Sequence, residues 1–331
     1  MAGFKLKEGQ FDNKTISEDE FWSTFNYVFS SRTKNTASYK FGFLKSIIDN
    51  LYNADENLIL TFNQLFSKFA EIYWNLILKY GIRQQAAASS TKGTLLEQIL
   101  HESVAQYGIA EDIPFESLSY EMMSEISRKV KIKCKTNVVG ALYGDTKGLL
   151  YSFSKKEEWI QLNPQMYKFL CRHKGVIEKL NYYEWAKFLE RVNKDTTLDR
   201  LLGKIDESTK RNSLFVYRQL LYMEFENRKC FYCGAELTIK NAQVDHFIPW
   251  SFIKDDNIWN FVLTCSSCNQ SKSDKLTDDV YLDALIERNE AIFAGNGSNN
   301  ENYKSDKLRD IFNWAKMNGY DDMWKPKKVK V

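Results

Sequence analysis

The stretch that decides the fold runs from Cys230 to Lys275 and begins Cys230-Phe-Tyr-Cys233. It continues with Val244-Asp-His-Phe-Ile-Pro249, and then with Asn260-Phe-Val-Leu-Thr-Cys265-Ser-Ser-Cys268-Asn269-Gln-Ser-Lys272. Four of the six cysteines and one of the three histidines of the chain lie here. Two C-x2-C pairs flank an Asp-His pair, so the pattern predicts that metal chemistry is concentrated in this stretch.

The cysteine pairs predict a structural zinc site. Zinc binds four thiolates in a tetrahedron, and C-x2-C spacing lets two successive ligands reach one ion. Cys230, Cys233, Cys265 and Cys268 supply the complete set, so no ligand position remains open for a substrate. We find no secretory leader pattern and no apolar run near the ~20 residues that span a bilayer, which predicts a cytoplasmic protein with no membrane partner. In that compartment paired cysteines bind metal more often than they form disulfides.

Length and composition predict two well-packed domains. The 331 residues are 44% hydrophobic and 15% aromatic, which is typical of globular proteins with a sizeable core. The formal net charge of +3 is too small to identify a nucleic-acid binder, so any phosphate-binding surface must be local. The polar segment 193–210 has no sustained period, and we place the domain boundary there, with domains at 1–210 and 211–331.

The first domain is predicted to be mainly helical. Capping-box pairs at Ser17/Glu20 and Thr94/Glu97 precede apolar residues at helical spacing. Aromatic stripes in these segments are interpreted as core, because helical spacing explains them without a ligand. The expected helices cover 16–30, 41–51, 61–80, 94–107, 117–128, 164–171 and 182–192.

A small β element is expected within this domain. Lysines alternate with apolar residues over 129–135, which predicts a strand whose basic face carries Lys131 and Lys133. The segments 138–143 and 149–153 flank a Gly-Asp-Thr-Lys-Gly turn and are predicted to form a hairpin. Two interpretations of the lysines stay open. They form either a solvated face that protects an edge strand or a track for nucleic-acid phosphates.

The second domain is predicted to hold a compact strand-strand-helix unit. The expected strands are 235–239 and 243–247, and a helix over 265–272 would place Cys265, Cys268, Asn269 and Lys272 on one face. Further helices are expected at 208–227, 280–294 and 306–317, and a short basic tail at 325–331. The fold class is therefore α+β, with a helical N-terminal domain and a zinc-braced ββα C-terminal domain.

The residues between the cysteine pairs suit metal-assisted phosphodiester hydrolysis. His246 can act as general base near neutral pH. Asp245 and the Asn269 carboxamide are hard oxygen ligands suited to Mg²⁺ or Mn²⁺. Asn260 is expected to hold the histidine or its loop in place, and Lys272 to meet a phosphate.

This pattern resembles the HNH (ββα-metal) endonucleases, with His246 as the first motif position, Asn260 as the second and Asn269 as the third. The run from Val244 to Asn260, followed by Asn269-Gln-Ser-Lys-Ser-Asp274, resembles the HNH domain of RNA-guided CRISPR effectors. The resemblance implies one catalytic metal held by Asp245 and Asn269. The layout of this chain is also similar to that of bacterial restriction and phage-defence nucleases, in which a second domain recognises a substrate, a signal or a partner protein.

We therefore predict an endonuclease that acts on nucleic acid, DNA rather than RNA, with the N-terminal domain serving recognition or regulation. Two alternatives stay open. One is an RNase effector with the same site, and the other is a non-catalytic zinc-knuckle module that binds nucleic acid or protein. A bare zinc module has no need of Asp245, His246 and Asn269 at these positions, and this favours catalysis.

Overall fold

The structure is a computed structural model that describes residues 5–11, 14–30, 32–33, 36–85, 93–194, 200–210, 213–224, 228–295 and 303–326. The loop expected around 84–93 lies largely outside the described residues, as do the Gly/Asn/Ser segment at 296–302 and most of the basic tail. The chain divides into two compact units, residues 1–210 and 211–331, and each is described by itself. No helix of the described residues is long and apolar enough to cross a membrane.

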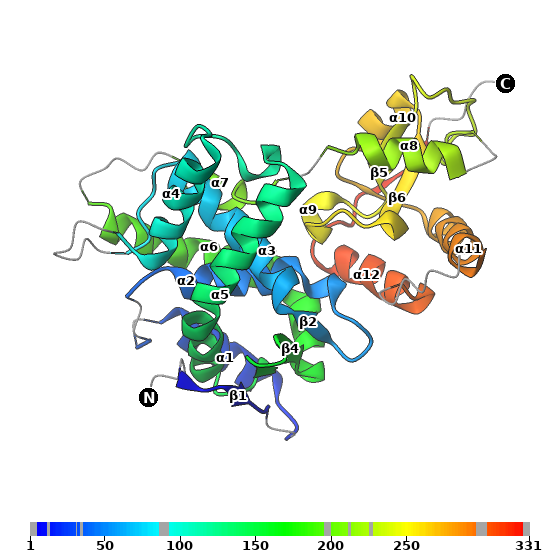
Figure 1. The fold of residues 1–331 in the computed structure, drawn as a ribbon. Helices are drawn as coiled ribbons and strands as arrows, with labels where there is room; N and C mark the ends of the chain where they lie inside the picture. The colour runs from blue at the N-terminus through cyan, green and yellow to red at the C-terminus, as the bar shows by residue number, and fades with distance from the viewer. Residues whose placement is uncertain are drawn as a thin grey trace. The chain divides into compact units, whose positions relative to one another are not determined.

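The N-terminal unit is built mainly from helices (Figure 1). Their bounds are α1 Glu18–Phe29, α2 Tyr39–Asp49, α3 Phe62–Trp74, α4 Leu95–Tyr107, α5 Tyr120–Asp145, α6 Pro164–Val192 and α7 Leu201–Asp206. A π-helical turn, Asn75–Lys79, extends α3. Among the described residues, β1 Glu8–Gly9, β2 Ile59–Thr61, β3 Tyr151–Ser154 and β4 Trp159–Leu162 form an antiparallel sheet in the order β1-β3-β4-β2.

The helix starts follow from side-chain caps that the sequence predicts. Ser17 caps α1 and Thr94 caps α4, and each forms a reciprocal capping box with the glutamate three residues later. Such a box satisfies two backbone N–H groups that a bare helix end would leave without partners. Gly108, with φ +60°, then ends α4 in the left-handed conformation that glycine adopts at least cost. The predicted helices 16–30 and 94–107 are therefore confirmed.

Aromatic side chains fill the core of the N-terminal unit. Helix α3 packs between α2 and α5 (Figure 1) and is fully buried at Phe66, Phe69 and Tyr73. The ring of Phe69 lies 4.6 Å from that of Tyr73 and 5.6 Å from that of Phe66. Tyr73 in turn lies 5.7 Å from the ring of Trp185 on α6. The aromatic stripes therefore form core, as predicted.

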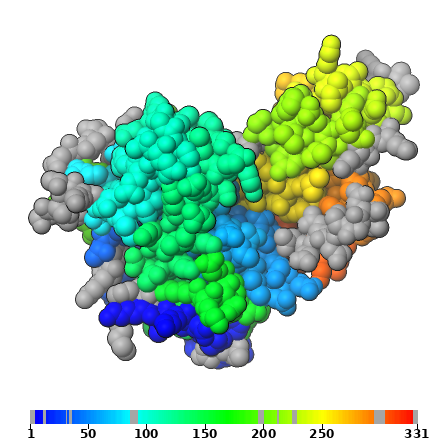
Figure 2. Space-filling model, viewed as in Figure 1, coloured from blue at the N-terminus to red at the C-terminus, as the bar shows by residue number. Residues whose placement is uncertain are grey.

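The predicted strand at 129–135 is wrong, because these residues belong to the long helix α5. Val130, Cys134 and Val138 are buried at helical spacing, whereas Ile132 is 46% exposed. Val130 and Cys134 therefore belong to the buried side of a helix, and the alternation of apolar residues with lysine does not mark a strand. Figure 2 shows the outer surfaces of α4 and α5 on one face of this unit.

The predicted hairpin at 138–153 is also misplaced. Helix α5 continues to Asp145, and the observed hairpin joins β3 to β4, with Tyr151 opposite Leu162 and Ser154 opposite Trp159. The two helices predicted at 164–171 and 182–192 form the single helix α6, which is kinked at His173 (φ −114°, ψ 18°).

The C-terminal unit is made of shorter elements. They are α8 Phe215–Glu224, β5 Gln243–His246, α9 Trp250–Ile253, β6 Phe261–Thr264, α10 Ser266–Lys272, β7 Leu276–Thr277, α11 Asp279–Gly295, α12 Ser305–Met317 and β8 Met323–Trp324. Strands β5 and β6 pair antiparallel, and β7 pairs with β8 in parallel. Helix α10 packs against β5, and α8 packs against both β5 and β6.

The strand-strand-helix unit exists, but its strands differ from those predicted. Strand β5 pairs with β6, placing Asp245 opposite Val262 and His246 opposite Phe261. The segment 235–239 makes only an isolated bridge, between Lys229 and Glu236. The apolar run of β6 lies immediately before the second cysteine pair. The hairpin therefore leads directly into α10 and joins Cys265 and Cys268 to the strand that carries Asp245 and His246.

Candidate active site

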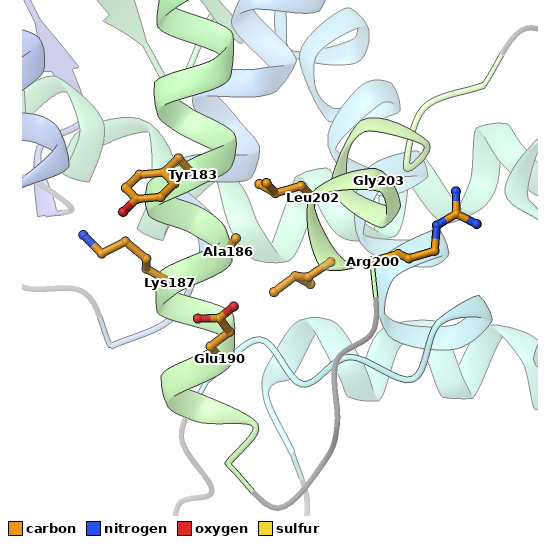
Figure 3. Close-up of a pocket in the computed structure, with 8 residues that line it drawn as sticks. Tyr183, Ala186, Lys187, Glu190, Arg200, Leu202 and Gly203 are labelled. Carbon is orange, nitrogen blue, oxygen red and sulfur yellow. The ribbon is translucent and has the colours of Figure 1, made fainter.

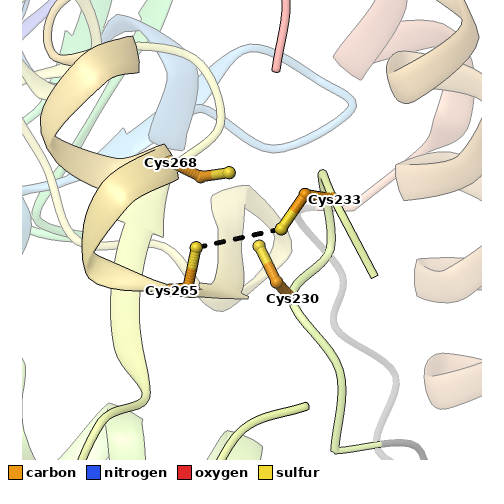
Figure 4. Close-up of side chains that lie close together, drawn as sticks. All are labelled: Cys230, Cys233, Cys265 and Cys268. Carbon is orange, nitrogen blue, oxygen red and sulfur yellow. Dashed lines mark hydrogen bonds between the residues drawn. The ribbon is translucent and has the colours of Figure 1, made fainter. Parts of the chain in front are cut away.

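Four thiols converge in the C-terminal unit (Figure 4). The sulfur atoms of Cys230, Cys233, Cys265 and Cys268 all lie within 4.8 Å of one another, and those of Cys233 and Cys265 are 3.8 Å apart. A tetrahedral zinc ion with Zn–S bonds of about 2.3 Å would separate its sulfurs by about 3.8 Å. The cluster therefore has the dimensions of a closed four-thiolate metal site.

The first cysteine pair is shaped by a tight turn that docks on β6. The Gly234 N–H donates to the Cys230 carbonyl (2.9 Å), and the Cys230 N–H donates to the Ala235 carbonyl (2.7 Å). Gly234 has φ +74°, a conformation that side chains disfavour. The Phe231 N–H donates to the Leu263 carbonyl of β6 (2.9 Å). The turn is therefore fixed to the same hairpin that carries Asp245.

Burial affects the thiols directly. It raises the pKa of Cys230, and burial together with the neighbouring Cys230 raises the pKa of Cys268. Against the effect of burial, hydrogen bonds from the neighbouring cysteines lower the pKa of Cys265. A bound divalent metal deprotonates its thiol ligands. The chemistry of this ligand set therefore fits a metal such as zinc.

Asp245 lies on β5 and is 5% exposed. Its Oδ2 accepts a hydrogen bond from the Tyr232 hydroxyl (2.8 Å) and an ion pair from the Lys272 ammonium group (3.0 Å). Burial, followed by the charge of Asp245, raises the pKa of Tyr232 well above its usual value, so the phenol remains a donor. Tyr232 was not identified from the sequence, because its position inside a cysteine pair suggested only a spacer.

His246 contacts a different set of residues. Its Nε2 lies 2.9 Å from Asp256 Oδ1, and the ring makes an edge-to-face contact with Phe261 at 4.8 Å. The side chains of His246 and Asp256 are 3% and 6% exposed. Asp256 was also missed in the sequence, since it sits in a loop and no spacing rule connects it to the histidine. Its carboxylate fixes the ring and favours the tautomer with the proton on Nε2.

Asn260 closes the loop that follows β5. Its Oδ1 accepts from the Ile248 N–H and its Nδ2 donates to the Ile248 carbonyl, both at 2.8 Å. Its own carbonyl accepts from the Phe247 N–H (2.8 Å), and the side chain is completely buried. Asn260 thus holds the backbone just beyond His246 and has no exposed atom with which to contact a substrate.

Helix α10 brings Asn269 toward β5. The Asn269 Nδ2 donates to Gln243 Oε1 (2.8 Å). Gln243 and Asp245 are two residues apart on β5, so their side chains leave the same face of the strand. Among the described residues, no donor reaches Asn269 Oδ1 or Asp245 Oδ1. Two oxygen ligands on this face are therefore available to a hard cation.

Lys272 requires a correction. Its side chain is fully buried, and Nζ donates to the His246 carbonyl (2.8 Å) as well as to Asp245. An ammonium group engaged in this way inside the protein is not presented to a phosphate. Lys272 instead joins α10 to Asp245 and His246 of β5.

The lysines of 129–135 lie on helix α5 and not on the predicted strand, and a role in binding phosphates stays a prediction. Lys131 belongs to the N-terminal unit, where Nζ lies 2.5 Å from Glu158 Oε2 and 2.8 Å from Asn63 Oδ1. Glu158 also binds Lys135 at 2.6 Å, so one carboxylate is shared by two ammonium groups and offsets one of their two charges. Lys133 is exposed on α5. The lysines follow a helix and do not form a row on a strand.

The N-terminal unit contains a surface pocket of about 400 Å³ between α6 and α7 (Figure 3). Lys187 and Glu190 line it from α6, and Arg200 and Leu202 from the start of α7. Figure 3 shows the Arg200 side chain directed away from Glu190. A ligand site usually has polar groups that converge on one point. This pocket shows no such convergence and gives no argument for a ligand.

Comparison with known proteins gives the class of this unit. Residues 230–277 match the family model described as HNH endonuclease. The chain is similar to the CRISPR-associated endonuclease Cas9 of Listeria innocua serovar 6a, at 38% identity over 72 residues, and to that of Streptococcus mutans serotype c, at 41% over 66 residues. Residues 230–277 of the C-terminal unit therefore resemble an HNH endonuclease domain.

The likeness is confined to this domain. The two alignments cover 21% and 19% of this chain and 5% of each relative, so the chain spans a small part of the length of the curated relatives that it matches. No solved structure matches the chain. The function of the N-terminal unit must therefore be argued separately from that of the HNH domain.

Proposed function

We propose that the C-terminal unit is a metal-dependent endonuclease that hydrolyses phosphodiester bonds of DNA. The observation that carries the proposal is the adjacent pair Asp245 and His246 on β5. Asp245 presents a carboxylate oxygen on the face of Asn269, and His246 is held by Asp256. A module that only binds nucleic acid or protein would not need a buried His–carboxylate pair on the strand that also carries an oxygen ligand.

Asp245 and Asn269 are the proposed ligands of the catalytic metal. Each offers an oxygen to which no described residue donates, and Mg²⁺ or Mn²⁺ accepts few protein ligands and keeps several waters. A bound cation supplies positive charge to the non-bridging and leaving oxygens of the phosphodiester as negative charge develops. Lys272 and Tyr232 orient the Asp245 carboxylate.

His246 is the proposed general base. Asp256 accepts from Nε2–H, and the neutral imidazole of that tautomer carries its lone pair on Nδ1. Nδ1 is buried in this structure, so it takes the proton of the attacking water once that water has reached the ring, and Asp256 stabilises the imidazolium that results. Asn260 fixes the backbone after the histidine through Ile248, and so sets the direction of the ring relative to β5.

The four thiols are proposed to hold a structural zinc ion. All four positions of the tetrahedron are filled by cysteine, so zinc would brace α10 and the Cys230–Cys233 turn and take no part in hydrolysis. The catalytic and structural metals thus use different residues on the same short elements.

We infer that the N-terminal unit, residues 1–210, governs target choice or activation of a cytoplasmic nuclease in restriction or phage defence. A nuclease needs a gate to spare its host, and a separate unit with its own aromatic core provides a body on which recognition of nucleic acid or of a partner protein can be built. DNA is preferred to RNA because of the resemblance to the HNH domain of RNA-guided CRISPR effectors.

Incubation of the purified chain with supercoiled DNA, linear DNA and RNA tests this proposal. Each substrate is combined with Mg²⁺, with Mn²⁺ and with EDTA. We expect nicked or linear DNA in the presence of either metal and no product with EDTA. Cleavage of RNA alone would favour the RNase alternative, and retention of DNA in a gel without cleavage under any condition would favour a binding module.

Replacing the proposed base gives the sharper measurement. His246→Ala should lower the cleavage rate by about 10²–10⁴-fold, the usual contribution of a general base, while zinc content stays unchanged. His101→Ala is a matched control, because His101 lies in the N-terminal unit and its side chain is 49% exposed. A His246→Ala variant that cleaves at the wild-type rate would remove His246 from the mechanism.

A further inference from the structure

Two donors approach the same oxygen of the Asp245 carboxylate. The Tyr232 hydroxyl lies 2.8 Å and the Lys272 ammonium 3.0 Å from Oδ2, and no described residue donates to Oδ1. A carboxylate can exchange its two oxygens by rotating about the Cβ–Cγ bond. Two donors at one oxygen oppose that rotation, so Oδ1 is held as the oxygen that faces a ligand.

Tyr232 is itself held rigidly. Its side chain is almost completely buried and makes edge-to-face contacts with Tyr281, at 5.6 Å between ring centroids, and with Trp324, at 5.1 Å. The Tyr281 hydroxyl donates to the Tyr232 carbonyl (3.3 Å). Packing therefore fixes the ring, and the O–H bond points to Asp245 Oδ2, its acceptor among the described residues.

The two donors belong to the two halves of the thiol cluster. Tyr232 lies within the turn between Cys230 and Cys233, whereas Lys272 lies on α10, one turn beyond Cys268. An ion that holds the four sulfurs together therefore also holds both donors against one carboxylate oxygen. Residues that support a metal ligand in this way commonly change metal affinity by about 10–100-fold when they are removed.

We propose that Tyr232 is a positioning residue for the catalytic metal. Its hydroxyl orients the Asp245 carboxylate so that Oδ1 meets the divalent cation. The affinity of the active site for that cation therefore depends on the conformation of the Cys230–Cys233 turn. The inference rests on the proposed metal-dependent nuclease site. It gives Tyr232, which lies between Cys230 and Cys233, a role in binding the catalytic metal.

The test measures Mn²⁺ binding to zinc-loaded protein by titration calorimetry, without nucleic acid. Tyr232→Phe removes one hydroxyl and keeps the ring contacts, and we expect Mn²⁺ affinity to fall about tenfold with zinc content unchanged. Tyr281→Phe is the matched control, because it removes a hydroxyl that bonds the Tyr232 backbone and not Asp245. We expect this control to bind Mn²⁺ as the wild type does.

A second readout separates positioning from general damage. In Tyr232→Phe the Mg²⁺ concentration for half-maximal cleavage should rise about tenfold, while the rate at saturating Mg²⁺ stays near that of the wild type. A hydroxyl with a purely structural role would lower the saturated rate without shifting the metal dependence, and that outcome would overturn the inference.

The outcomes also distinguish the inference from the proposed function. Asp245→Ala should abolish Mn²⁺ binding, and if it binds Mn²⁺ as tightly as the wild type, the proposed metal site itself fails. If Asp245→Ala loses the metal while Tyr232→Phe binds it normally, only the positioning role fails. Loss of zinc from Tyr232→Phe would likewise overturn that role, because the hydroxyl would then serve the turn and not the carboxylate.

Discussion

The two units of the chain gain their order from different interactions. The helices of the N-terminal unit reach 29 residues in α6 and bury aromatic side chains along whole faces. In the C-terminal unit, β5 and β6 have 4 residues each and α10 has 7. Helices shorter than about 12–15 residues are marginal by themselves, so elements this short need additional constraints. Buried polar side chains and the thiol cluster provide these constraints around Asp245 and His246.

The structure around Asp245 and His246 is therefore held by a few hydrogen bonds and ion pairs, whereas the N-terminal unit is held by many apolar contacts. Asn260, Lys272 and Tyr232 each bind backbone or carboxylate groups with good geometry. Phe69 instead contacts several rings and makes no polar contact. Single substitutions should therefore act in different ways in the two units.

The largest effect is expected from Cys265→Ser. Structural zinc contributes about 10–16 kcal/mol of apparent binding free energy in small zinc domains, so loss of one thiolate should release zinc and unfold the C-terminal unit. The helices of the N-terminal unit should persist in far-ultraviolet circular dichroism. Cys134→Ser is the control, because Cys134 lies on α5 outside the cluster and should leave zinc content unchanged. Unchanged zinc in Cys265→Ser would contradict the four-thiolate site.

The next effect is expected from Phe69→Ala in the N-terminal unit. Removing a fully buried ring should lower the free energy of unfolding of that unit by about 3–5 kcal/mol, measured by urea denaturation. Zinc content should not change. Phe215→Ala, at a side chain that is 53% exposed, should change stability by no more than about 0.5 kcal/mol. Equal effects of the two variants would remove the distinction between core and surface on which the comparison rests.

A smaller effect on stability is expected from Asn260→Ala. This change leaves the Ile248 N–H and carbonyl without their partner and should lower the free energy of unfolding of the C-terminal unit by about 2–4 kcal/mol. Gln270→Ala, on the exposed side of α10, serves as the control. An Asn260→Ala variant with unchanged stability would show that the loop after β5 does not need the two side-chain hydrogen bonds to Ile248.

Much of the N-terminal fold could be predicted from the sequence, because local signals coincide there with the final structure. Ser17/Glu20 and Thr94/Glu97 define helix starts by hydrogen bonds within four residues, and the apolar stripes follow the helical period. Prediction failed where two periods overlapped. Val130 and Cys134 fit a helical stripe as well as an alternating one, and the exposure of Ile132 was needed to decide between them.

The candidate site was predictable in its ligand types and not in its contacts. Cysteine spacing predicted the cluster of four thiols, and the chemistry assigned to the Asp245-His246 pair stays a prediction. The contacts of Asp256 with His246 and of Tyr232 with Asp245 join residues 10 and 13 positions apart through loops and turns. No periodicity encodes such contacts. The burial of Lys272 likewise depends on how α10 packs on β5, which sequence spacing does not state.

Helix α10 also limits which insertions, deletions and substitutions this region can accept. From its N-cap Cys265 to Lys272 it presents two thiols, the amide of Asn269 and the buried amine of Lys272, at positions that share one side of the helix. One inserted or deleted residue would rotate everything beyond it by about 100° and separate the two thiols from Asn269 and Lys272. The outward positions Ser267, Gln270 and Ser271 are exposed and free to vary. We therefore expect this segment to tolerate changes of residue at those three positions while it excludes any change of length.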